Sequence, residues 1–151
     1  DLITSLTDIK TKYPTCTDFE KEFISLTFAL ATGVGKTVIS AFDYKDFCRE
    51  NKMSNNKLLF VAHREEILKQ SRDTFRAILK DNNFGDLMVG NNTPTSLEHL
   101  FVSIQSLNSK NLCEVTSSDY YDFIIVDEFH HAAAPSYQRL LEYYKPKILF
   151  T

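Results

Sequence analysis

The feature that most restricts the fold is an alternation of short, continuous apolar runs with amphipathic segments. Such runs are typical of strands covered on both faces, and apolar residues three and four apart are typical of helices that pack by one face. The predicted strands are residues 25–31, 57–63, 87–90, 99–107, 121–128 and 147–151, and the predicted helices are residues 36–50, 64–80, 106–115 and 135–145. This pattern predicts a three-layer α/β domain with a mainly parallel sheet.

The length and composition fit one domain without a membrane anchor. The chain has 151 residues, and no apolar run in it approaches the ~20 residues that a membrane helix requires. We expect a cytoplasmic protein, with residues 1–21 as a poorly defined lead-in and residues 22–151 as the folded domain. The net charge of −3 still allows a local basic face. The three widely spaced cysteines predict reduced, mostly buried thiols.

The stretch "FALATGVGKTVIS" places a glycine turn between an apolar run and a predicted helix. Gly33 and Gly35 permit backbone angles that direct several N–H groups at one anion, and the helix start adds a positive dipole end. Lys36 would then reach the β- and γ-phosphates of a nucleotide, and the Thr37 hydroxyl would bind Mg²⁺. Leu30 stands where the strict phosphate-loop pattern has glycine, so a plain glycine turn with a surface lysine is the alternative.

A pair of carboxylates, Asp127 and Glu128, follows the apolar run "FIIV". Two adjacent acids at the end of a buried strand are costly unless a cation meets them, and nucleotide-bound Mg²⁺ is such a cation. Asp127 would hold the ion through water, and Glu128 would orient and deprotonate the attacking water. Ligands of open α/β sheets collect at the carboxyl ends of strands, where this pair and the glycine turn would meet. A solvated strand end is the alternative.

Four motifs in order resemble motifs I, Ia, Ib or Ic, and II of superfamily 2 helicases and translocases. They are "ATGVGKT", "VAHREEIL", "VSIQSL" and "VDEFHH", and the last is similar to a DEAH-type box. The resemblance covers about residues 22–151 and is greatest to motor subunits of type I and type III restriction enzymes and related bacterial DEAD/DEAH-box helicases. It implies the first RecA-like P-loop NTPase domain of an ATP- and Mg²⁺-dependent motor.

Carried over to this chain, the resemblance assigns nucleotide roles to individual residues. The loop that binds ATP would comprise Thr32, Gly33, Val34, Gly35, Lys36 and Thr37. Lys36 and Glu128 would be catalytic, and Thr37 and Asp127 would serve the metal ion. His130 would couple the state of ATP to a second RecA-like domain, and Thr151 would open motif III.

The resemblance also implies a nucleic-acid track across this domain and a second RecA-like domain. Arg64 and His63 lie in the motif that contacts the nucleic-acid backbone, and Ser103 or Gln105 would lie on the same track. An ordinary strand-to-helix junction at His63 and Arg64, and a buried glutamine that holds a loop, are the alternatives. The expected partners are double-stranded DNA, the second domain, and nuclease or methyltransferase subunits.

Two departures limit what the resemblance implies. No glutamine motif precedes the glycine turn, which leaves the selectivity for adenine open. The sequence also contains no second domain or its arginines, so we expect the chain alone to bind nucleotide weakly and to be nearly inactive. The alternative functions are an ATPase that remodels protein partners without nucleic acid and a nucleotide-binding module without hydrolysis.

Overall fold

The computed structural model describes residues 35–127 and 135–150. The helices are α3 (Gly35–Glu50), α4 (Glu65–Leu79), α5 (Ile104–Ser109), α6 (Leu112–Val115) and α7 (Pro135–Tyr143). The strands are β1 (Leu58–Ala62), β2 (Asp86–Met88), β3 (His99–Ser103), β4 (Phe123–Val126) and β5 (Ile148–Phe150). The predicted strand 25–31 lies outside the described residues.

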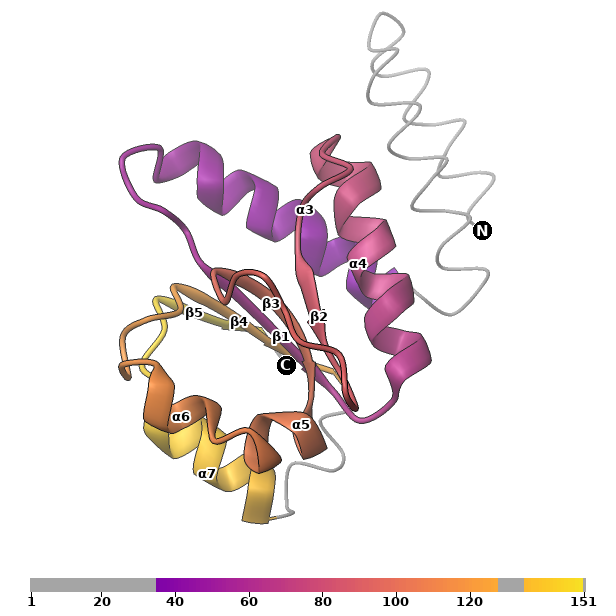
Figure 1. Cartoon of the computed structure of the whole chain (residues 1–151). Helices are drawn as coiled ribbons and strands as arrows, with labels where there is room; N and C mark the ends of the chain where they lie inside the picture. Colours follow the sequence, from indigo (N-terminus) through magenta and orange to yellow (C-terminus); the bar gives the residue numbers. More distant parts are fainter. Residues whose placement is uncertain (1–34, 128–134, 151) are drawn as a thin grey trace, which may run out of the picture.

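The described strands form one parallel sheet in the order β2-β3-β1-β4-β5. Helices α3 and α4 cover one face, and α5, α6 and α7 cover the other (Figure 1). The central strand β1 is buried along its whole length, as a strand covered on both sides must be. The predicted three-layer α/β domain with a parallel sheet is therefore confirmed.

The core beneath α3 and α4 is largely aromatic. The ring of Tyr44 in α3 lies 5.4 Å from that of Phe123 and 6.0 Å from that of Phe75 in α4. Phe75 in turn packs edge-on against Phe101 of β3. The half-buried His99 ring lies beside this cluster, and burial lowers the pKa of its imidazole, which favours the neutral form.

The core on the opposite face joins α7 to the turn after α6. Tyr137, Leu140 and Tyr144 are buried against the sheet. The hydroxyl of Tyr144 lies 2.7 Å from the Thr116 hydroxyl, so the polar end of this buried ring has a partner. Both helical layers are thus fixed to the sheet by residues whose spacing the sequence shows.

The amino ends of three neighbouring strands are tied together through Asp122. Its carboxylate accepts the backbone N–H of Lys57 at 3.0 Å, and its backbone carbonyl accepts the N–H of Lys147 at 2.9 Å. The Lys147 ammonium also lies 3.8 Å from the Asp122 carboxylate. Because Lys57, Asp122 and Lys147 precede β1, β4 and β5, these contacts fix the strands at the amino edge of the sheet.

The run 99–107, predicted as one strand, is a strand and a helix. Strand β3 ends at Ser103, whose hydroxyl accepts the backbone N–H of Ser106 at 3.1 Å. A serine in this position caps a helix, so α5 begins directly after the strand. Ile104 and Leu107 are buried on one side of this helix. The prediction of strand beyond Ser103 is wrong, and Gln105 is a helical residue.

Gly85 occupies a position that excludes a side chain. Its φ is +82°, and a Cβ built there would lie 2.6 Å from Cε2 of the buried Phe101 ring. We expect Gly85→Ala to lower the free energy of unfolding by about 2–4 kcal/mol, because it adds backbone strain to a clash in a packed core. Gly90, with φ +54° and no atom within 4 Å of a built Cβ, is the matched control.

Urea denaturation measures both substitutions. Gly90→Ala should cost about 1 kcal/mol, since only the backbone strain applies there. If Gly85→Ala and Gly90→Ala lower the free energy of unfolding equally, the Phe101 ring moves aside for the new methyl group at no energetic cost.

Candidate functional site

The predicted site residues gather at the carboxyl edge of the sheet. The strands β2, β3, β1 and β4 are adjacent and parallel, so all of them end at this edge. Arg64 and His63 follow β1, Gln105 follows β3, and Asp127 follows β4 directly. This edge is where open α/β sheets bind their ligands.

Asp127 is held beside the end of β1. Its backbone N–H donates to the carbonyl of Val61 at 2.8 Å, which extends the pairing of β1 and β4 one residue beyond β4. The residue is half-buried. Asp127 therefore lies beside the end of β1, the strand that His63 and Arg64 follow.

The first turn of α3 carries the described part of the predicted nucleotide loop. Gly35 opens the helix and is buried, Lys36 is exposed, and Thr37 is buried at 8% exposure. Near its other end, α3 lies over the amino edge, where the Tyr44 hydroxyl donates to the carbonyl of Asn56. The first turn is therefore the part of α3 that lies farther from the amino edge. The N–H groups in the first turn of a helix have no partner within the helix, and these groups and the helix dipole favour an anion.

The remaining nucleotide assignments stay predictions from sequence. Thr32, Gly33, Val34, Glu128, His130 and Thr151 lie outside the described residues. Thr37 and Asp127 supply oxygen atoms, which Mg²⁺ prefers together with water and phosphate oxygens, so this pair fits the ion. Among residues 35–127 and 135–150, no group of three or more His, Cys, Asp and Glu residues could hold a metal ion by itself.

His63 and Gln105 meet across the carboxyl edge although they are 42 residues apart in sequence. The Nε2 atom of Gln105 lies 3.1 Å from Nδ1 of His63, and both side chains are exposed. The alternative of a buried glutamine is wrong for this reason. Each of the two residues was a separate candidate in the sequence, but their contact depends on β1 and β3 being neighbours.

Arg64 and Ser103 differ in what they present at this edge. Arg64 is the extended residue before α4, with φ −108° and ψ 138°, and it is exposed. Ser103 is buried at 7% exposure and uses its hydroxyl to cap α5. Of the two candidates in "VSIQSL", Gln105 is therefore the one exposed to a ligand.

The cysteines of the described residues carry no reactive feature. Cys48 and Cys113 are free and half-buried rather than buried, and burial raises the pKa of both thiols. Cys16 lies outside the described residues. In the described part of the chain, no helix combines the length and apolar character needed to cross a membrane.

The parallel sheet with helices on both faces is a RecA-like α/β domain. A solved structure of the helicase domain of Hef from Pyrococcus furiosus has the same fold, with a TM-score of 0.52 and 14% sequence identity. The match covers 98% of this chain and 34% of that structure. The chain belongs to the ResIII family, described as type III restriction enzyme, res subunit, whose pattern matches residues 5–151.

Two curated relatives are yeast proteins. The chain is 29% identical over 120 residues to the putative mitochondrial ATP-dependent helicase irc3 of Schizosaccharomyces pombe, covering 79% of this chain and 19% of that protein. It is 32% identical over 122 residues to the putative ATP-dependent helicase IRC3 of Saccharomyces cerevisiae, covering 78% of this chain and 17% of that protein. The matched part is thus less than one fifth of each relative.

Proposed function

We propose that the full-length protein hydrolyses ATP to move on double-stranded DNA, and that this chain supplies half of its ATP site. The observation that carries this proposal is the position of Asp127, bonded through its backbone to Val61 at the end of β1. Two residues beyond Val61, His63 contacts Gln105. The acid assigned to Mg²⁺ and the residues assigned to DNA are therefore on adjacent strands, where a change at one can be transmitted to the other.

The nucleotide half of the site would work mainly by positioning and charge. The N–H groups at the start of α3 and the Lys36 ammonium bind phosphate oxygens, and Thr37 and Asp127 hold the ion. Bound Mg²⁺ neutralises charge on the phosphates. Glu128 takes the proton of the attacking water.

The DNA half would be completed outside this chain. Arg64, His63 and Gln105 contact the sugar–phosphate backbone, which fixes the position of the domain without reading sequence. A second RecA-like domain closes over the nucleotide, and His130 couples the two domains. The family name supports a restriction-type motor, and the names of the yeast relatives support a helicase. Nuclease or methyltransferase subunits as partners stay a prediction from sequence. A cytoplasmic location stays a prediction, since one relative is named as mitochondrial.

Steady-state ATP hydrolysis by the full-length protein, with and without double-stranded DNA, tests the proposal. We expect DNA to stimulate hydrolysis and Lys36→Ala to remove both the basal and the stimulated rates. Lys52→Ala is the matched control, because Lys52 is an exposed lysine in the turn between α3 and the amino end of β1. A parallel assay with RNA covers the other nucleic acid. If neither DNA nor RNA changes the rate of hydrolysis, the result would instead support an ATPase that remodels protein partners.

A further inference from the structure

A lysine that belongs to none of the motifs lies at the carboxyl edge beside the outer strand β2. Lys110 is the residue at which α5 ends, and its Nζ donates to the backbone carbonyl of Asn92 at 2.7 Å. Asn92 belongs to the turn that follows β2: its N–H donates to Val89 at 2.9 Å, and its side chain donates to Leu87 at 3.3 Å. Lys110 and this turn therefore form one connected surface.

The turn that Lys110 contacts carries no acidic residue. The segment from Leu87 to Leu97 contains no Asp or Glu, and Gly90, Asn91, Asn92 and Thr93 are exposed. The nearest acid on this connection, Asp86, lies at the start of β2, where it accepts hydrogen bonds from Thr95 and Ser96. Lys110 thus contributes a cation beside an exposed turn that carries no acidic residue, and Glu114 is the acid nearest to Lys110 in sequence.

This surface is continuous with the residues assigned to DNA. Along the edge, the order of strands places the turn after β2 first, Gln105 after β3 second, and His63 and Arg64 after β1 third. Two strand spacings separate β2 from β1, which is roughly 10 Å. That length corresponds to about three nucleotides along one strand of a duplex.

We propose that Lys110 contacts a DNA phosphate and so extends the DNA track to the outer edge of the sheet. The inference rests on the proposed function. An ammonium has three N–H donors, so the bond to Asn92 leaves donors for a phosphate oxygen. The same bond fixes where the charge lies, which reduces the entropy lost on binding.

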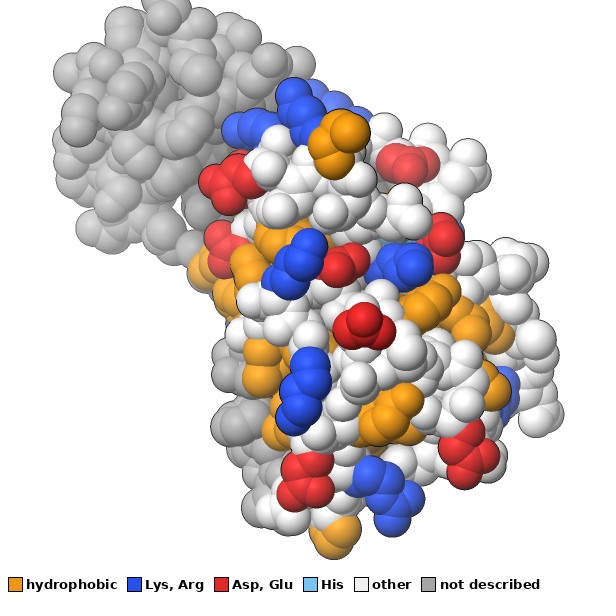
Figure 2. Space-filling model, turned by 90° about the vertical axis from the view of Figure 1, so that its left-hand side faces the viewer, with side chains coloured by type: hydrophobic (Ala, Val, Ile, Leu, Met, Phe, Trp, Pro, Cys, Tyr) orange, Lys and Arg blue, Asp and Glu red, His pale blue; other side chains and the backbone are white. Residues whose placement is uncertain are grey.

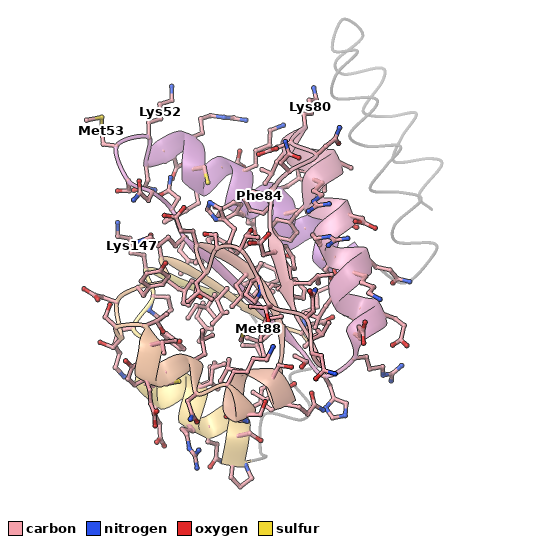
Figure 3. All side chains as sticks on the ribbon, in the orientation of Figure 1. Lys52, Met53, Lys80, Phe84, Met88 and Lys147 are labelled. Atoms are coloured by element: carbon pink, nitrogen blue, oxygen red, sulfur yellow. The ribbon has the colours of Figure 1, made fainter. Side chains whose placement is uncertain are left out.

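The opposite edge provides a control with the same charge. Lys52, Met53 and Lys147 lie together on the side of the molecule away from Met88, the last residue of β2 (Figure 3). On the face that includes this region, Lys and Arg side chains alternate with Asp and Glu (Figure 2). Lys52→Gln therefore removes the same charge as Lys110→Gln at a place outside the proposed track.

The experiment measures binding of the full-length protein to a labelled DNA duplex by fluorescence anisotropy over a range of salt concentrations. We expect Lys110→Gln to weaken binding about two- to fivefold. The slope of log K against log salt should fall in magnitude by about 0.9, as for the loss of one phosphate contact. Lys110→Arg should keep the affinity and the slope, and Lys52→Gln should match the unchanged protein.

Three results would overturn the proposal in distinguishable ways. If Lys110→Gln keeps the affinity and slope while Arg64→Gln loses both, the track does not reach Lys110, and the proposed function stands. If Lys110→Gln loses affinity with an unchanged slope, Lys110 only positions the turn. If the unchanged protein binds no DNA, the proposed function itself fails. Thermal melting of each variant confirms that it is folded.

Discussion

The isolated chain is expected to hydrolyse ATP about 10³–10⁵ times more slowly than the full-length protein on DNA. In the proposed function, a second RecA-like domain supplies an arginine to the transferring phosphoryl group, and a protein made of residues 1–151 alone would have to work without that arginine. Charge that develops on that group then stays uncompensated on one side. Steady-state hydrolysis at saturating ATP and double-stranded DNA measures both proteins.

Lys36→Ala in the full-length protein measures the background rate of ATP hydrolysis that comes from contaminating ATPases. Turnover of several per second by the isolated chain would contradict the prediction. In that case the chain would form a complete catalytic site without a partner domain.

Glu128→Gln is expected to slow hydrolysis by the full-length protein by about 10²–10⁴-fold, because an amide cannot accept the proton of the attacking water. Nucleotide binding should persist, since Lys36, Thr37 and Asp127 are unchanged. Single-turnover hydrolysis and titration with a fluorescent ATP analogue separate the two effects.

Glu98→Gln provides the matched control, since Glu98 is an exposed glutamate just before the amino end of β3. It should hydrolyse ATP like the unchanged protein. Unchanged hydrolysis by Glu128→Gln would remove Glu128 from the catalytic role and favour a nucleotide-binding module without hydrolysis.

The periodicity of apolar residues was sufficient to predict most of the sheet and its covering helices. The runs around β1 and β4 are continuous because both faces of these strands are covered, and α4 begins and ends within a residue of its predicted bounds. A helix was predicted from residue 106, two residues after the true start of α5, because Ile104 and Leu107 continue the apolar run. Their spacing of three residues and the serine at 103 were the available signs of a capped helix.

The contacts at the carboxyl edge depend on the order of strands, which the apolar pattern does not contain. His63 and Gln105 were both singled out, but only the adjacency of β1 and β3 brings them to 3.1 Å. Lys110 could not be singled out, because a lone lysine after a short helix has no distinguishing spacing. Its position follows from a hydrogen bond to a turn 18 residues earlier in the chain.

Asp122 has a consequence for how this domain can change over evolution. It joins the amino ends of β1, β4 and β5, whereas the residues assigned to ATP and DNA lie at the other ends of these strands or beyond. The contacts that join the strands and the residues assigned to ligands are therefore about one strand length apart. Exposed residues at the carboxyl edge, such as Arg64 and Gln105, can therefore be replaced without loss of the Asp122 contacts, so ligand preference can change while these strands stay joined.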